Sequence, residues 1–151
     1  MLDLEDPANR RVVDYFAKRD ERDQPLDEPA YYPPIERLTT HPEVLGHLWR
    51  DLGSKIPPAC ARFVRGTPCL VQDQSGIILA FALGTAYAMR LPLPERGEAL
   101  LAGATAAMKW SGGAVTDLAK DLEGGWLWGR WVGPEPAWMA AAYSAFERSP
   151  G

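Results

Sequence analysis

Apolar residues in the middle of the chain come in short runs that groups of turn-forming residues separate. The runs cover residues 62–65, 69–72, 77–83 and 86–91. Between them stand Gly66-Thr67-Pro68, Asp73–Gly76 and Gly84-Thr85, and glycine, aspartate and serine are residues that tight connections favour. Loops of about two to five residues between such runs are typical of hairpins. The sequence therefore predicts an antiparallel meander over residues 61–91.

The longest run alternates in side-chain size, which predicts two different faces. Large residues stand at every second position from Ile77 to Leu83, and two of the positions between them are alanines, Ala80 and Ala82. Successive side chains of a strand point to opposite sides, and a sheet that is apolar on both sides needs cover from helices or a second subunit. The large face comprises Ile77, Leu79, Phe81, Leu83 and Tyr87. The pattern leaves open whether that face is core, an apolar ligand slot or a dimer contact.

Apolar residues at helical spacing flank the meander on both sides. A first helix is expected after the start signal Asp6-Pro7, and a second after Thr40, which would cap it together with Glu43. Residues 94–108 predict an alanine-rich helix that packs on the small face of the sheet, and residues 114–122 a short further helix. The last helix is expected after Pro136, with a stripe that contains Trp138, Met139, Ala142, Tyr143 and Phe146.

These elements predict an α+β fold in a single domain. Its antiparallel sheet would have about five strands, the meander 61–91 plus a strand near 125–132, packed with flanking helices. Residues 1–30 carry nine acidic and five basic side chains and are expected to form an acidic N-terminal helix and arm. Residues 31–151 carry eleven charges of each sign and are expected to form the α+β domain itself.

The densest aromatic group in the sequence lies at residues 125–132, GWLWGRWV. On a strand, Trp126, Trp128 and Arg130 would share one face. Large aromatic side chains beside arginine are residues that binding hot spots favour. Together with Arg90 they form the predicted binding surface of a non-catalytic binding or regulatory module. Core packing of the tryptophans is the alternative.

Two other functions fit the same pattern. A small-molecule-binding protein or enzyme would use the large apolar face as a slot, with Tyr87, Arg62 and Arg90 as its polar groups. A structural homo-oligomer would join two chains through the sheet. We therefore predict a protein partner or self-association, and the sequence identifies no small-molecule ligand.

The sequence lacks the motifs of common catalytic sites. It has neither a glycine-rich phosphate loop nor a GxSxG elbow. No sequence feature singles out two of its carboxylates as an acid–base pair. His41 and His47 are expected to be solvated, and Cys60 and Cys69 to be free thiols in or near the core. No catalytic residue, metal or cofactor is predicted, and the interpretation leans away from an enzyme.

Charge and hydropathy set the expected location and exclude some partners. No apolar run reaches the roughly 18–20 residues that a membrane-spanning helix needs, and the N-terminus lacks the basic start of a signal peptide. We therefore expect a cytoplasmic protein with no membrane partner. Because the net charge is −4 and the domain carries no basic stripe, nucleic-acid binding is disfavoured.

The segment GTPCLVQDQSGIILAFALGTAYAMRLP resembles a pattern of the TfoX N-terminal/YjbR-like group of small α+β proteins. The matching pieces are Gly66, Ser75-Gly76, Ile77–Leu83, Gly84 and Tyr87–Arg90, and a C-terminal helix with Trp138 and Tyr143 also suits that group. The acidic N-terminal arm and the tryptophan-rich strand depart from the pattern. The resemblance covers residues 59–147 and implies a compact sheet with flanking helices and a regulatory or binding role. It implies no catalytic residue.

Overall fold

The computed structural model describes residues 2–19, 22–31, 40–84, 86–104, 126–128 and 133–147, without the side chains of Ala8, Arg19 and Trp128. Six strands in these ranges form one sheet in sequence order, each antiparallel to the next. The strands are β1 (Asp27–Pro29), β2 (Ala61–Val64), β3 (Thr67–Val71), β4 (Ile78–Leu83), β5 (Ala86–Arg90) and β6 (Trp126–Trp128). The helices are α1 (Pro7–Arg19), α2 (Pro42–Gly46), α3 (Leu93–Leu101) and α5 (Glu135–Ala145). A π-helical turn at His47–Asp51 and 3-10 turns at Leu52–Lys55 and Pro58–Cys60 follow α2.

The predicted α+β fold is confirmed. The meander is β2 to β5, and β6 is the strand expected near residues 125–132. The sixth strand, β1, comes from residues that we expected to form an arm. It pairs with β2, and the ring of Tyr31 just beyond it lies 5.0 Å from that of Phe63.

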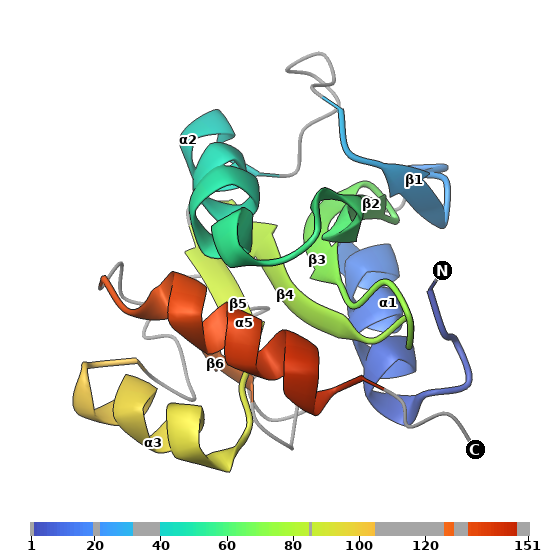
Figure 1. Ribbon diagram of the computed structural model, residues 1–151. Coiled ribbons are helices and arrows are strands. Elements are labelled where there is room, and N and C mark those ends of the chain that lie inside the picture. The colour runs from blue at the N-terminus through green and yellow to red at the C-terminus, as the bar shows by residue number, and fades with distance from the viewer. Residues whose placement is uncertain are drawn as a thin grey trace.

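Helices from the two ends of the chain cover opposite faces of the sheet (Figure 1). On the α1 face, Val12 and Phe16 of α1 pack with Phe81 and Trp126. On the α5 face, α5 and the helical turns after α2 pack over the middle strands. Each face of the sheet is therefore covered by helices of this same chain, which is the first of the two arrangements that the sequence left open.

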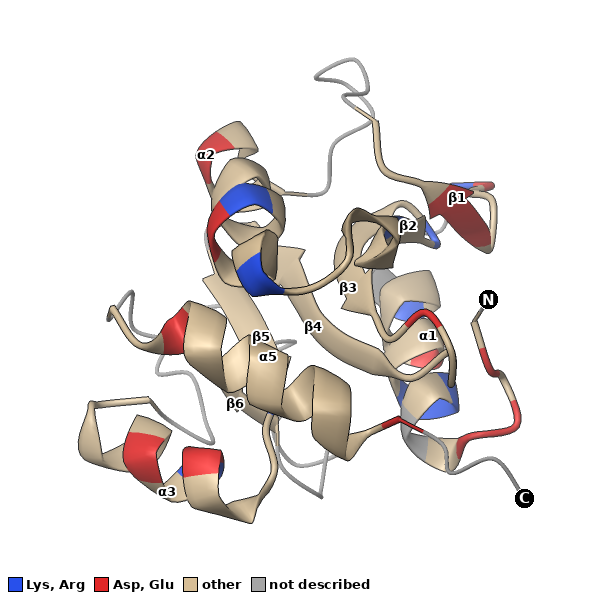
Figure 2. Ribbon diagram, viewed as in Figure 1, with Lys and Arg blue, Asp and Glu red and all other residues tan. Residues whose placement is uncertain are grey.

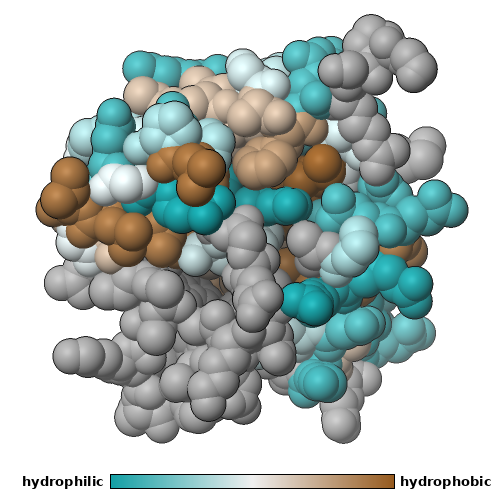
Figure 3. All heavy atoms as spheres, turned by 90° about the horizontal axis from the view of Figure 1, so that it is seen from below, coloured by the Kyte–Doolittle hydropathy of each residue, from teal (hydrophilic) through white to brown (hydrophobic). Residues whose placement is uncertain are grey.

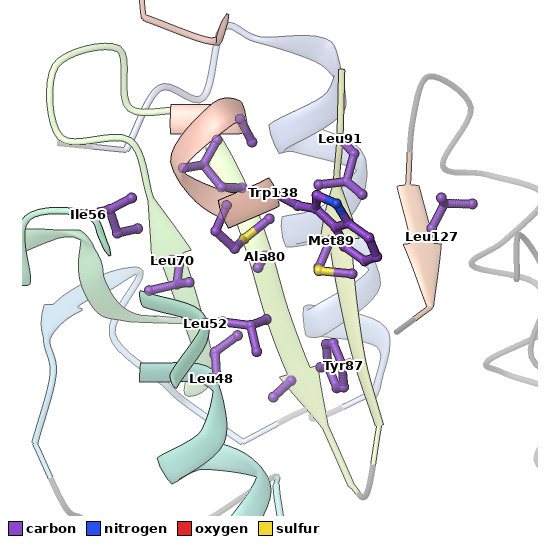
Figure 4. Packing of buried hydrophobic residues seen from close by; sticks show 14 of the residues in the cluster. Leu48, Leu52, Ile56, Leu70, Ala80, Tyr87, Met89, Leu91, Leu127 and Trp138 are labelled. Carbon is purple, nitrogen blue, oxygen red and sulfur yellow. The ribbon is translucent and has the colours of Figure 1, made fainter. Parts of the chain in front are cut away.

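The core of the α5 face is mainly aliphatic. Leu48, Leu52 and Leu70 meet the small side chain of Ala80 there, and Trp138 of α5 lies beside Met89 (Figure 4). Small residues on β4 let the helical turns approach the strand closely. α5 and those turns cover most of this face, and Ala99 and Ala104, from the segment expected to form a helix over residues 94–108, belong to the same buried cluster. Residues 105–125, which hold the rest of that helix and the short helix expected at 114–122, lie outside the described residues.

The prediction of one large and one small face is wrong, because the register of β3 and β4 shifts. Leu70 lies opposite Ala80, but Val71 lies opposite Ile78, so Leu79 is an extra residue in the ladder. Such a bulge reverses the alternation beyond it. Leu79 packs on the α5 face, whereas Phe81 packs on the α1 face.

α1 is fixed to the sheet by one buried side chain as well as by apolar packing. The Asn9 amide donates to the carbonyl of Asp3 at 2.7 Å and to that of Gly76 at 2.8 Å. Its oxygen accepts from the N–H of Ile78 at 2.9 Å. The Asp6 carboxylate accepts from the N–H of Asn9 at 3.0 Å, which confirms Asp6 as the start of the helix. Asn9 thus joins the first turn of α1 to the start of β4.

α2 does not begin with the capping box that the sequence predicts. Its cap is His41, whose Nδ1 accepts from the N–H of Glu43 at 3.2 Å. The hydroxyl of Thr40 instead donates to the carbonyl of Ala82 at 2.6 Å. Thr40 therefore bonds to the main chain of β4 and does not cap α2.

Pro68, which the sequence predicts in a turn, lies within β3 opposite Phe63.

Charged side chains are distributed around the outside of the fold. Figure 2 shows charged residues on α1, β1, α2, α3 and the start of α5, whereas β3 and β4 are tan. Among the described residues, no helix has the length and apolar character to cross a membrane.

Candidate functional site

Trp126, the first residue of the predicted aromatic surface, belongs to the core. It is 8% exposed, and its ring lies 5.1 Å from that of Phe81. Ala88 pairs with Phe81 in the register, so its small side chain leaves space for the two rings to meet. The prediction that Trp126 forms an exposed surface is therefore wrong, and the alternative of core packing is right for it. The side chain of Trp128 and the whole of Arg130 lie outside the described residues.

Tyr87 is also a core residue. It is 1% exposed, and its hydroxyl donates to the carboxylate of Glu135, which is equally buried at the start of α5. The ring of His47 lies 5.5 Å from the Tyr87 ring. Tyr87 packs on the α5 face and Phe81 on the α1 face, so these two residues cannot line one slot. Tyr87 therefore joins the sheet to α5 and does not face a ligand.

Arg62 lies at the opposite end of the sheet order from Arg90. It is on β2, and its Nε donates to the Asp27 carboxylate of β1. β3 and β4 separate β2 from β5, which carries Arg90. The structure therefore does not bring Arg62 and Arg90 together, and Arg62 stabilises the edge of the sheet.

Arg90 ends β5 at a point where three other elements meet. Its Nη1 lies 3.9 Å from an oxygen of Asp6, the residue that caps α1. Its guanidinium carbon lies 4.7 Å above the ring of Phe146, at the end of α5. A cation over an aromatic face is an attractive contact, stronger when solvent is excluded. The Arg90 side chain is 16% exposed, so this end of the sheet holds a largely buried positive charge.

A second arginine, Arg96 of α3, lies at the same end of the sheet. Its Nη2 donates to the carbonyl of Leu91 at 3.3 Å. Burial lowers the pKa of Arg90 from its ordinary value, the Asp6 charge opposes that change, and the Arg96 charge lowers the pKa further. The charge of Arg96 thus acts on the guanidinium group of Arg90. We call the group Arg90, Arg96, Asp6 and Phe146 the Arg90 site.

Several buried donors at this site are unused by the part of the chain that the structure describes. They are Nε and Nη1 of Arg90 and Nε of Arg96. The indole N–H of Trp126 is buried and unused in the same way, and Trp126 lies directly opposite Arg90 in the register, hence on the same face. Buried donors without an acceptor cost free energy, so an acceptor brought to this group of atoms would stabilise the protein.

The cysteines are buried free thiols, as predicted. Burial, followed by the charge of Asp73, raises the pKa of Cys60 to about 11, and burial raises that of Cys69 well above its ordinary value. The thiolate is the reactive form of cysteine, so both side chains are inert at neutral pH. No group of three or more metal-binding side chains is found within the described ranges.

His47 departs from the prediction that it is solvated. It is half-buried beside Tyr87, and its Nδ1 lies 3.0 Å from the Asp51 carboxylate one turn on. Burial lowers the pKa of His47 from its ordinary value of 6.5, and the hydrogen bond and charge of Asp51 oppose that change. The ring is therefore neutral at pH 7.

Sequence reasoning missed Arg96, Asp6, Phe146 and Glu135. Asp6 was noted only as a helix cap, and Phe146 only as part of a buried stripe. For Arg96 and Glu135 no local signal exists, because a charged residue in the first turns of a helix is ordinary on a solvated surface. The contacts of these residues join segments that are far apart in the chain, so local sequence pattern does not reveal them.

A scan against models of known protein families, a search of curated proteins and a search of solved structures each find no match to this chain. The resemblance to the TfoX N-terminal/YjbR-like group therefore stays a prediction.

Proposed function

We propose that this protein is a non-catalytic binding module and that the Arg90 site is the centre of its binding surface. The observation that carries the proposal is the cluster of unused, buried donors on two neighbouring arginines. Arg90 is common to the proposed site and to the surface that the sequence predicts. The aromatic partner in the proposed site is Phe146, in place of the tryptophans.

The composition of the site supports binding. Arginine and aromatic residues are enriched where partners bind most strongly, and a largely desolvated arginine held over a ring is a preorganised contact. Asp6 and Phe146 hold the Arg90 side chain from α1 and α5, so little conformational freedom remains to be lost on binding. The resemblance to the TfoX N-terminal/YjbR-like group, which implies a regulatory or binding role, agrees with the proposal.

The burial of the ionisable side chains elsewhere supports a role without catalysis. Tyr87 and Glu135 are each 1% exposed and bond to each other within packed core. A substrate would have to displace α5 to reach them. The two thiols are buried as well, with raised pKa values.

Native mass spectrometry of the protein purified from its own host tests the proposal. We expect a bound partner or small molecule on the natural protein, and its loss in Arg96→Gln. The control is Arg62→Gln, which removes the same charge at the far edge of the sheet and is expected to keep the bound species. Circular dichroism checks that both variants fold. A bound species that Arg96→Gln retains at the natural occupancy would contradict the proposal.

The exposed leucines of α3 favour self-association as a second candidate function. Leu93 is 75% exposed and Leu101 is 92% exposed, with Leu100 beside it. Figure 3, which views the molecule from the side of α3, shows hydrophobic side chains on this surface. Exposed apolar groups of this kind mark contact surfaces. If two chains meet here, Leu101→Ser shifts a dimer to a monomer in light scattering, and a natural protein that is monomeric at high concentration removes this candidate.

A further inference from the structure

The donors of the Arg90 site are arranged for one kind of acceptor. The guanidinium carbon of Arg90 lies over the Phe146 ring, a contact that uses the positive charge of the group and none of its N–H donors. Two of its nitrogens, Nε and Nη1, are buried and have no acceptor among the described residues. A ligand that fits here must bring acceptor oxygens and negative charge.

The carboxylate of Asp6 is the negative charge already at the site, and its hydrogen bond goes to α1 and not to Arg90. Asp6 is 3.9 Å from Arg90 Nη1, which is beyond hydrogen-bond length. The same Asp6 oxygen accepts from the N–H of Asn9 at 3.0 Å to begin α1. Asp6 therefore holds Arg90 in place electrostatically while leaving the donors of Arg90 unused.

Arg96 adds a second positive charge and another unused donor. One end of its guanidinium is fixed to the carbonyl of Leu91, the residue after Arg90, and its Nε is buried without an acceptor in the described ranges. Two guanidinium groups that repel each other are stabilised when an anion lies between them. Guanidinium groups bind carboxylate and phosphate oxygens through strong charge-assisted hydrogen bonds.

We propose that the Arg90 site binds an oxyanion, the phosphate or carboxylate group of a ligand, held between the guanidinium groups of Arg90 and Arg96. This inference rests on the proposed function, because it names the ligand chemistry of the same surface. Two arginines in a protein of net charge −4 suit a single anionic group and not a polyanionic backbone, which needs an extended basic stripe.

The test is thermal unfolding of the full chain with inorganic phosphate in one arm and acetate in the other, each against chloride at equal ionic strength. A ligand that binds only the folded state raises the unfolding midpoint, and the rise follows a saturation curve. We expect such a curve with at least one of the two anions. The anion that produces it shows whether the site prefers a phosphate or a carboxylate group. In Arg96→Gln, we expect the apparent affinity to fall about tenfold, as for loss of a charge-assisted contact. Arg62→Gln is expected to bind as the natural protein does.

A midpoint that neither anion changes in a saturable way would overturn the inference. Equal weakening in Arg62→Gln and Arg96→Gln would overturn it as well, because the effect would then come from net charge alone. Arg90→Lys keeps the charge and removes the planar group, so we expect this variant to bind the anion still more weakly. If Arg90→Lys does not fold, Arg96→Gln still decides the outcome. If phosphate or acetate binds as expected but the partner seen by mass spectrometry is indifferent to Arg96→Gln, the oxyanion site stands and the proposed function fails.

Discussion

The two faces of the sheet are held by different kinds of contact. On the α1 face, aromatic rings pack edge to face, with Phe16 5.2 Å from Phe81, and Asn9 bonds to the main chain of the hairpin. On the α5 face, a larger aliphatic cluster surrounds one bond between two side chains, Tyr87 and Glu135. Apolar packing holds each helix against the sheet without specifying its position. We therefore expect the buried polar contacts, those of Asn9 on one face and the bond between Tyr87 and Glu135 on the other, to set where each helix lies.

The two faces also differ in the buried polar groups that they hold. On the α5 face, Tyr87 and Glu135 bond to each other within packed core. The α1 face continues past its aromatic contacts to the end of β5, where Arg90 keeps unused donors. The proposed binding site therefore lies at the end of β5, on the α1 face.

The largest expected effect is that of Asn9→Ala on the α1 face. The change removes three hydrogen bonds and leaves the buried N–H of Ile78 without its acceptor. We expect a loss of about 2–4 kcal/mol in the free energy of unfolding, measured by urea denaturation. Asn9→Asp keeps an acceptor for Ile78 and should lose less. A loss below about 1 kcal/mol in Asn9→Ala would show that aromatic packing alone positions α1.

A smaller effect is expected from Tyr87→Phe on the α5 face. The change keeps the ring and removes the donor to the buried carboxylate of Glu135, so we expect a loss of about 1–3 kcal/mol by the same measurement. Tyr143→Phe is the matched control, since its hydroxyl donates to Asp73 at 2.6 Å on the surface. Equal losses in the two variants would remove the contrast between a buried and an exposed bond.

The smallest effect is a pH dependence that belongs to the α5 face. The pKa of His47 is lower in the folded protein than its ordinary value of 6.5, so below about pH 6.5 the unfolded chain binds the proton first. Stability is therefore expected to fall as the pH decreases from 6.5 through the folded pKa. His47→Gln should flatten this part of the curve, measured as the unfolding midpoint from pH 7 to pH 5. An unchanged slope would show that other groups cause it.

Local pattern was sufficient for much of the fold. Turn residues and apolar runs predicted β2 to β5 because hairpin neighbours are also neighbours in sequence. The bulge at Leu79 could not be predicted, since the residues on both sides of it are apolar and suit either face. β1 was missed because Asp27–Pro29 is short and charged, the composition of an edge strand as much as of a linker.

The candidate site was predictable only at Arg90. Its partners Asp6, Arg96 and Phe146 come from three helices, and their meeting depends on the packing of all of them against the sheet. Trp126 was misplaced for a related reason. A tryptophan pattern on a strand predicts which residues share a face, but not whether a helix covers that face.

Pro68 has a consequence for how the molecule opens. The register of β3 and β4 ends at the pair Cys69 and Phe81, and its extension by one pair would set Pro68 against Ala82. Proline has no N–H to give to the carbonyl of Ala82. The hydroxyl of Thr40 fills that place, and the next residue donates its N–H to the carbonyl of Gly84 at 2.7 Å. A residue from outside the sheet thus completes the ladder. Fraying of β4 at this end and release of the segment before α2 are accordingly one cooperative event, and the amide proton of His41 exchanges with solvent when that event occurs.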